Sequence, residues 1–276
     1  MVIDHATSTA LIGQNRKNQT GLQKIFGKLS SGKRINRASD DAAMLSIARE
    51  LEKQVRGFQT VETNIDDALS AIRIADGASG SISDLLQRQR ELAIQANNGT
   101  IGQNGRDALN KEFQALSAEI DRISQAAQFN KQQLLDGTSQ LSNGSGQIQV
   151  GTSTNDHDQI NMPQANLRSA NLGIDNLDIS DAANINAAIN GLDTAMEKVN
   201  ATRTTQGAAF NQFAYAQEGA ANTRINTSAA LSQAEDLDYA QGVAEMARQS
   251  LLQESNFSAL DNFNEIARNN VLALLG

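Results

Sequence analysis

The residues best suited to catalysis lie in one short stretch, where a serine precedes two carboxylates. Ser39, Asp40 and Asp41 would offer a nucleophile and two acids, but a serine hydroxyl needs a neighbouring base such as histidine to become reactive. The chain has no cysteine and two histidines, neither of them near this stretch. We therefore interpret Ser39 as the N-cap of the next helix and the aspartates as partners for the positive end of its dipole.

A second stretch carries residue types that bind metal ions. His157 stands between Asp156 and Asp158, but these residues are adjacent in a turn, and His5 is the other histidine of the chain. The acidic run from Asp175 to Asp181 lacks the central glycine and terminal glutamate of a calcium-binding loop. We expect no metal site, no cofactor and no catalytic residue, and hence a protein that is not an enzyme.

The dominant pattern of the sequence is a stripe of apolar residues at alternating steps of three and four. This spacing predicts one narrow face of an α-helix, roughly 75 to 80 Å long if continuous, with a short interval marked by Gly77 and Gly80. So long a stripe requires partner helices of similar length. The stripe consists of Met44, Ile47, Leu51, Val55, Phe58, Val61, Ile65, Ala68, Ile72 and Ala75, and then Ile82, Leu85, Gln89, Leu92 and Ala96.

The rest of the chain offers these partners. Residues 109–127 carry a second stripe, which we expect to fold back antiparallel, and a third stripe begins at Ile185. The third stripe passes Arg203 and Gln206, polar residues that can fix register at seam positions. Residues 147–151 and 158–162 alternate with period two and predict a small β-hairpin over about 147–162. The expected fold is mainly α, an elongated antiparallel helical bundle or coiled coil with this hairpin.

The two ends of the chain are amphipathic and have opposite charges. Residues 1–30 alone bury too little apolar surface to offset chain entropy, so we expect them to be disordered or frayed in a monomer. Charged residues in 16–37 are all basic, whereas 235–265 are mostly acidic. Two solvated faces would explain this pattern; alternatively, the terminal helices pair on assembly. That hypothesis assigns the pairing to Lys24, Lys28, Lys33, Glu245, Glu254 and Asp261.

Charge and hydropathy exclude two classes of partner. The formal net charge of −8 argues against nucleic acid, and the absence of a long apolar run argues against membrane insertion. The N-terminus lacks the pattern of a cleaved signal peptide.

We expect four segments: an N-terminal assembly segment (1–40), the N-terminal part of a rod-like core (41–184), the C-terminal part of that core (185–235) and a C-terminal assembly segment (236–276).

Several ordered motifs resemble bacterial flagellins. Residues 29–43 resemble the family block L-S-S-G-x-R-I-N-x-A-x-D-D-A-A, and residues 86–96 resemble L-Q-R-x-R-E-L-A-x-Q-A. Residues 119–124 with Phe129-Asn130 resemble the E-I-D-R-x-S and F-N elements, and residues 203–213 resemble the C-terminal block R-x-x-x-G-A-x-x-N. The short link before Ile185 implies a short form without the variable outer domains.

This resemblance implies a structural subunit that is exported unfolded through the flagellar type III channel and polymerises into the extracellular filament used for swimming. Its implied partners are copies of itself, an export chaperone, and the hook-associated junction and cap proteins. The opening residues 1–6 and Arg268 depart from the family pattern, so the junction protein between hook and filament is the alternative. A coiled-coil adhesin or scaffold fits the periodicity equally well, and the ordered motifs count against it.

The resemblance also implies a partner in animal hosts. The family segment contacted by the Toll-like flagellin receptor resembles residues 88–95, with Arg90, Ile94 and Glu112 at matching positions and Arg88 at the start of the segment. Alternatively, these residues serve packing between subunits.

Overall fold

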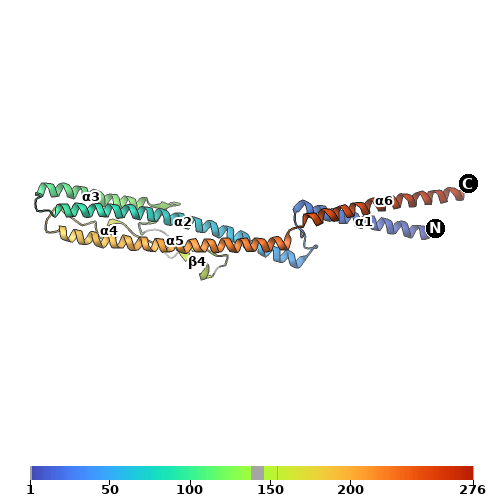
Figure 1. The fold of residues 1–276 in the computed structure, drawn as a ribbon, viewed down its shortest axis with the longest axis horizontal. Coiled ribbons are helices and arrows are strands. Elements are labelled where there is room, and N and C mark those ends of the chain that lie inside the picture. The colour runs from blue at the N-terminus through green and yellow to red at the C-terminus, as the bar shows by residue number, and fades with distance from the viewer. Residues whose placement is uncertain (1, 138–145, 154, 276) are drawn as a thin grey trace. The chain divides into compact units, whose positions relative to one another are not determined.

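The structure is a computed structural model that describes residues 2–137, 146–153 and 155–275 (Figure 1). Long helices alternate with two small hairpins, so the predicted mainly helical, antiparallel fold with a small β-hairpin is confirmed. The elements are α1 (Val2–Ser31), α2 (Ala42–Ala96), α3 (Gln103–Ala126), β1 (Gln128–Phe129), β2 (Gln132–Gln133), β3 (Gln147–Gln149), the 3₁₀ turn η2 (Asp156–Asp158), β4 (Gln159–Asn161), α4 (Ser169–Leu172), α5 (Ile185–Glu235) and α6 (Tyr239–Leu275).

The chain forms two compact units. One comprises residues 1–55 with 226–276, and the other comprises residues 56–225. We call them the terminal unit and the central unit. Their boundaries fall inside α2 and α5 rather than between elements, and the division into four segments stays a prediction.

In the central unit, the buried face of α2 repeats at steps of four and three without a break. The predicted interval at Gly77 and Gly80 is wrong, because Ser79 continues the stripe, fully buried, with its hydroxyl donating to the Ala75 carbonyl at 2.7 Å. In the terminal unit the stripe is also displaced, since Ile47 is exposed and Ala48 is buried. The central face consists of Val61, Ile65, Ala68, Ile72, Ala75, Ser79, Ile82, Leu86, Gln89, Ala93 and Ala96.

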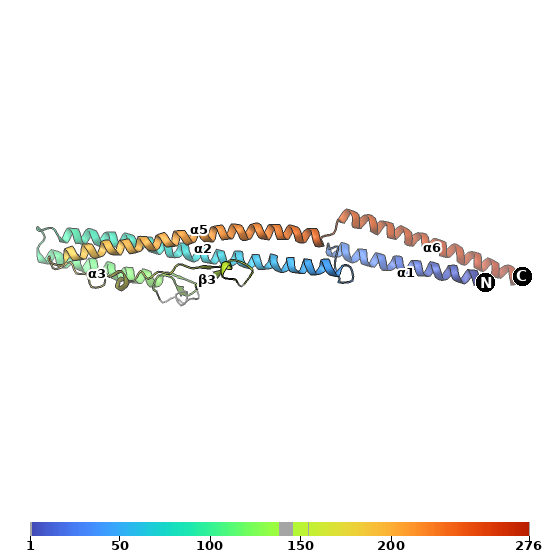
Figure 2. The same ribbon diagram turned by 90° about the horizontal axis from the view of Figure 1, so that it is seen from below.

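Helices α3 and α5 cover this face of α2, and both run antiparallel to it (Figures 1 and 2). Gln89 of α2 bonds to Phe113 and Ser117 of α3. Along α5 the partners of α2 descend in order, since Arg90 pairs with Asp193 while Glu62 pairs with Arg224.

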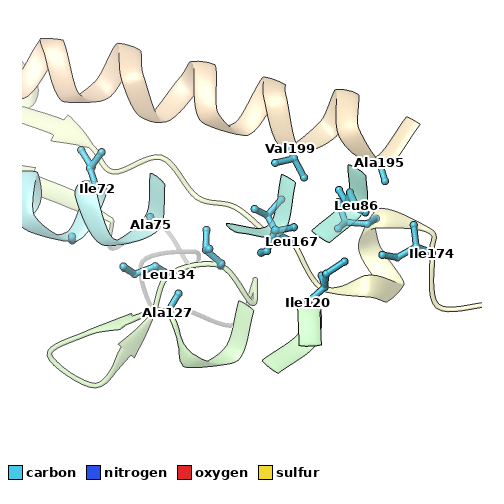
Figure 3. Packing of buried hydrophobic residues seen from close by; sticks show 14 of the residues in the cluster. Ile72, Ala75, Leu86, Ile120, Ala127, Leu134, Leu167, Ile174, Ala195 and Val199 are labelled. Atoms are coloured by element: carbon cyan, nitrogen blue, oxygen red, sulfur yellow. The ribbon is translucent and has the colours of Figure 1, made fainter. Parts of the chain in front are cut away.

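The segment between β4 and α5 fills the remaining side of the core. Leu167 and Ile174 from this segment lie among Ile120 of α3 and Val199 of α5 (Figure 3). Asp121 fixes the segment, because its carboxylate accepts hydrogen bonds from the Ser169 backbone N–H at 2.8 Å and hydroxyl at 2.7 Å.

Both hairpins are antiparallel. The predicted pairing of β3 with β4 is confirmed, with Ile148 opposite Ile160. The β1–β2 hairpin was not predicted. Its two-residue turn places Asn130 and Lys131 at positive φ, as the right-handed twist of a tight hairpin requires.

In the terminal unit, α1 and α6 lie side by side (Figure 2). The expectation that residues 1–30 are disordered or frayed in a monomer is wrong for residues 2–30, which form α1 and pack against α6. Gly32 ends α1 with φ of +69°, a left-handed conformation that suits glycine. The next helix begins after Asp41, whose carboxylate accepts the Met44 N–H at 3.0 Å, so Asp41 is its N-cap rather than Ser39.

Candidate interaction surfaces

In the terminal unit, Lys33 and Arg34 contact Ala234 and Glu235, and we call this group of contacts the clamp. The ammonium of Lys33 lies 2.8 Å from the carboxylate of Glu235, a residue that is almost fully buried. The backbone N–H of Arg34 donates to the Glu235 carbonyl at 2.6 Å, and its guanidinium donates to the Ala234 carbonyl at 2.8 Å. These contacts satisfy carbonyl groups at the C-terminal end of α5, where a cation is favourable.

Above the clamp, glycines let α1 and α6 approach closely. A Cβ atom at Gly242 would lie 2.9 Å from the Leu29 side chain, and one at Gly21 would lie 3.4 Å from Gln249. The Tyr239 hydroxyl donates to the Leu29 carbonyl at 2.7 Å. Because residue numbers rise along one helix as they fall along the other, the two helices are antiparallel.

The pair leaves large apolar side chains uncovered. Phe26 on α1 is 68% exposed and Leu251 on α6 is 66% exposed. Phe26 also lines an open groove of about 430 Å³ with Leu22 and Met246. Further exposed apolar residues of the pair are Ile12, Tyr239, Val243, Leu252, Phe257, Ile266 and Leu272. Two helices alone cannot bury both sides of such faces.

Two of the predicted pairing lysines line a polar pocket rather than facing α6 alone. The pocket has a volume of about 410 Å³ and lies between α1 and the loop of residues 36–40, with Lys24 and Lys28 on its helical side. Asp40 lies in this pocket, and its pKa is below the ordinary value because the backbone N–H groups of Arg37 and Asn36 donate to its carboxylate, with smaller contributions from Lys28 and Lys24. The pocket therefore has more positive than negative charge.

The predicted acidic partners lie along α6. Glu245 accepts two hydrogen bonds from Arg248, the shorter at 2.7 Å, and it shares an open groove with Lys28. Glu254 and Asp261 are exposed. Of the six pairing residues, the structure thus brings Lys28 and Glu245 to one groove, and it pairs Lys33 with Glu235, which lies outside the predicted set.

The residues that match the receptor-contacting segment lie on the central unit. Arg88 donates to the Glu112 carboxylate at 2.9 Å and to that of Glu91 at 3.2 Å, which links α2 to α3 across an exposed surface. Arg90 faces α5 instead, with its guanidinium 2.7 Å from Asp193. The side chain of Ile94 is half exposed and lies outside the buried core.

Sequence reasoning missed the polar contacts that set the register between α2 and α5. Arg203 reaches Asp76 at 3.0 Å near the surface, and Arg224 reaches Glu62 at 2.8 Å in a less exposed place. Of the two polar residues predicted at the seam, Gln206 is the one that is buried. The helical stripes contain no signal for which charges would meet, because these partners are more than a hundred residues apart.

Over residues 2–137, 146–153 and 155–275, the structure contains no group of three or more His, Asp or Glu side chains arranged to hold a metal ion. His157 lies in η2 between the two aspartates, as a turn residue. No helix in these ranges has a stretch long and apolar enough to span a bilayer.

Comparison with known proteins identifies the family. Residues 4–140 match the bacterial flagellin N-terminal helical region, and residues 189–275 match the bacterial flagellin C-terminal helical region. The two matches contain most of the chain, including both helices of the terminal unit. The chain belongs to the bacterial flagellin family.

Individual relatives agree with this assignment. This flagellin is 36% identical to a flagellin of Halalkalibacterium halodurans over 88% of each chain. It is 34% identical to a flagellar filament 33 kDa core protein of Treponema phagedenis over the full length of both. The prediction of a flagellin, a structural filament subunit, is confirmed. Flagellins are a family of structural proteins rather than enzymes.

The alternative of a hook–filament junction protein is not favoured. A protein of Vibrio parahaemolyticus assigned to the flagellar hook-associated proteins superimposes with a TM-score of 0.60, covering 71% of this chain and all of the other. Their sequences are only 16% identical, so the similarity concerns the fold alone.

Proposed function

We propose that this flagellin polymerises through the uncovered faces of α1 and α6. The observation that carries the proposal is the exposure of Phe26 and Leu251, both about two-thirds exposed, on two helices that pack mainly on each other over residues 2–31 and 239–275. Burying one such side chain stabilises an interface by about 1.5 to 3 kcal/mol. Copies of the same chain offer matching apolar faces.

Such a contact produces a filament if the repeated contacts do not close into a ring. When one face of α1 and α6 meets a different face of the next copy, the contact is heterologous and can repeat without limit. The assembled product is then a helical polymer. We propose that it is the extracellular flagellar filament, that its subunits leave the cell through the flagellar type III channel, and that it serves swimming.

The terminal charges set register within this polymer. Lys28 and Glu245 share a groove, and the Lys33–Glu235 pair joins the loop after α1 to the C-terminal end of α5. Exposed pairs contribute only about 0 to 1 kcal/mol each, so their effect is on geometry more than on strength.

A charge-reversal series tests this role. Replacing Lys24, Lys28 and Lys33 by Glu should weaken assembly, and replacing Glu245, Glu254 and Asp261 by Lys in the same chain should partly restore it. A variant with only Lys24→Glu and Lys28→Glu keeps the buried Glu235 paired and serves as the control for folding. Unchanged assembly in the triple lysine variant would reject the hypothesis.

The exposed acidic face of α6 is also the surface we propose for an export chaperone before secretion. Glu254 and Asp261 lie on it beside exposed apolar residues, which suits a partner that shields the segment until assembly. The hook-associated junction and cap proteins would then contact the same terminal helices at the two ends of the filament.

A second proposal concerns the host Toll-like flagellin receptor. Arg88 and Ile94 of α2 and Glu112 of α3 are each exposed, and Arg90 is about two-fifths exposed. The test is a cell reporter assay of wild-type protein and Arg90→Ala, with Arg203→Ala as a control, because it breaks a similar α2–α5 ion pair elsewhere. Equal signals for wild type and Arg90→Ala would reject a role for Arg90.

The function itself is tested by polymerisation of purified chain, with and without short filament seeds, followed by sedimentation and negative-stain electron microscopy. Long tubular filaments are expected. Persistent monomers in the presence of seeds from the organism's own filaments would contradict the proposal and return attention to the junction protein.

A further inference from the structure

Three Asn-Gly pairs lie in the described part of the chain, and each has a different backbone setting. They are Asn98-Gly99, Asn104-Gly105 and Asn190-Gly191. In any Asn-Gly pair, the backbone nitrogen of glycine can attack the side-chain amide carbon of asparagine, because glycine has no side chain to hinder the approach. The attack requires a backbone nitrogen that is free of hydrogen bonding and a chain that can bend toward the amide.

Asn98-Gly99 satisfies both requirements. The pair lies in the turn between α2 and α3, and both residues are exposed. Within residues 2–137, the Gly99 N–H donates no hydrogen bond, although the N–H groups of Asn98 and Ile101 do. A side chain at Gly99 would meet open space. The glycine nitrogen is therefore accessible to water and to the neighbouring amide.

The turn also polarises the amide of Asn98. Its Oδ1 accepts a hydrogen bond from the Thr100 N–H at 3.1 Å. When a nucleophile adds to the amide carbon, negative charge develops on this oxygen, and a donor already in place stabilises it. The same hydrogen bond holds the amide beside the backbone of the turn.

The other two pairs lack these features. The Gly105 N–H donates to the Gly102 carbonyl at 3.0 Å in the first turn of α3. Asn190 and Gly191 lie inside α5, where each N–H belongs to the helical ladder, and Gly191 packs beside Leu177. Attack at either pair requires local opening of the helix.

We propose that Asn98 is a site of spontaneous deamidation in the folded protein. The Gly99 nitrogen loses its proton to water or hydroxide and forms a bond to Cγ of Asn98. The Cγ–Nδ2 bond breaks, ammonia leaves, and a five-membered succinimide remains. Water then opens the ring at either carbonyl, which leaves an aspartyl or an isoaspartyl residue at position 98.

The product changes a turn that connects two packed helices. A new carboxylate appears just after the C-terminal end of α2, where the helix dipole disfavours negative charge. The isoaspartyl form also lengthens the backbone of the turn by one atom. The adjacent residue, Asn97, donates from its side-chain amide to Oδ1 of Asn186 at 3.4 Å, so the modification lies beside a contact between this turn and α5.

The test follows all three sites in the full-length chain by peptide mapping and mass spectrometry during incubation at mildly alkaline pH. An isoaspartyl-specific carboxyl methyltransferase serves as a second probe of the product. In the folded protein we expect Asn98 to react at least about tenfold faster than Asn104 or Asn190, and in urea we expect the three rates to converge, because helix opening no longer limits them.

Gly99→Ala is the matched variant, because its added methyl group meets open space and hinders only the attack. We expect it to slow the reaction at position 98 by about tenfold or more and to leave the other two sites and the helical circular dichroism unchanged. Equal rates at the three sites in the folded chain, or an unchanged rate at Asn98 in Gly99→Ala, would overturn the proposal.

Discussion

The side-chain amide of Gln89 donates to the hydroxyl of Ser117 at 2.7 Å, and both residues are buried between α2 and α3. The same amide donates to the Phe113 carbonyl at 3.0 Å, whereas no described donor reaches Gln89 Oε1. A polar residue at this seam position holds one register between the helices at a cost in stability. The seam of the central unit is therefore not built from apolar packing alone.

This arrangement predicts effects of different size for two substitutions at Gln89. Gln89→Ala should destabilise the protein by about 2 to 4 kcal/mol, because it removes two hydrogen bonds and leaves a cavity. Gln89→Leu should change stability by less than about 1 kcal/mol, because it fills the space and removes the unpartnered oxygen. Urea unfolding followed by circular dichroism measures both, and a leucine variant as unstable as the alanine variant would contradict this account.

A second prediction distinguishes the two candidates for the cap of α2. Asp41→Ala should destabilise the terminal unit by about 1 kcal/mol, because the Met44 N–H loses its acceptor. Ser39→Ala is the control and should have an effect below about 0.5 kcal/mol. Hydrogen exchange at the Met44 amide reports the loss directly, and greater fraying in Ser39→Ala than in Asp41→Ala would show that the cap is assigned wrongly.

A third prediction concerns the pKa of Glu245. Hydrogen bonds from Arg248 and then from Gln249 lower this pKa from 4.5 to about 2. Because the folded pKa is depressed, the ion pair contributes above the unfolded value near 4.5 and is lost as the pH falls toward 2. The Glu245 side chain is 39% exposed, so salt should weaken the effect.

Carboxyl titration by nuclear magnetic resonance checks this prediction. In Arg248→Gln the pKa of Glu245 should rise toward its ordinary value, and in Gln249→Ala it should rise less. A pKa that is unaltered by Arg248→Gln would show that the guanidinium does not hold the carboxylate in solution.

Sequence periodicity predicted the helical elements, but it could not assign every position to the buried face. Gly77 and Gly80 suggested an interruption, yet the helix continues through both. Ser79 can occupy the buried face between them because its hydroxyl donates to the Ala75 carbonyl and needs no partner from another helix. Likewise, Ile47 is more apolar than Ala48, but the helix phase exposes the isoleucine. Phase depends on which helices cover the stripe, and that is a tertiary property.

Local signals were also ambiguous where several residues could fill one role. Ser39, Asp40 and Asp41 are all good N-cap residues. The choice follows from the preceding loop, where Asp40 accepts the Asn36 and Arg37 N–H groups and leaves Asp41 for the helix. The β1–β2 hairpin was missed because its turn places Lys131 at positive φ, where lysine is uncommon, so the sequence carries no turn signal there.

The candidate surfaces were predictable in part. Opposite charges at the chain ends indicated that these ends meet, but the buried partner of Lys33 proved to be Glu235, about two hundred residues away. No local pattern marks that partner among the neighbouring acids. The contacts of Arg90 with Asp193 and of Arg224 with Glu62 also join residues far apart in sequence, by 103 and 162 residues.

The most direct test of assembly through α1 and α6 is the concentration of unpolymerised protein at equilibrium with seeded filaments. The double variant Phe26→Ser, Leu251→Ser should raise this concentration at least about tenfold, because each side chain leaves an apolar contact worth more than about 1.4 kcal/mol. Tyr215→Ser on α5, a residue 76% exposed in the central unit, is the control and should change it little. A double variant that polymerises at the wild-type concentration, with monomer helicity intact, would contradict the proposal that these faces build the filament.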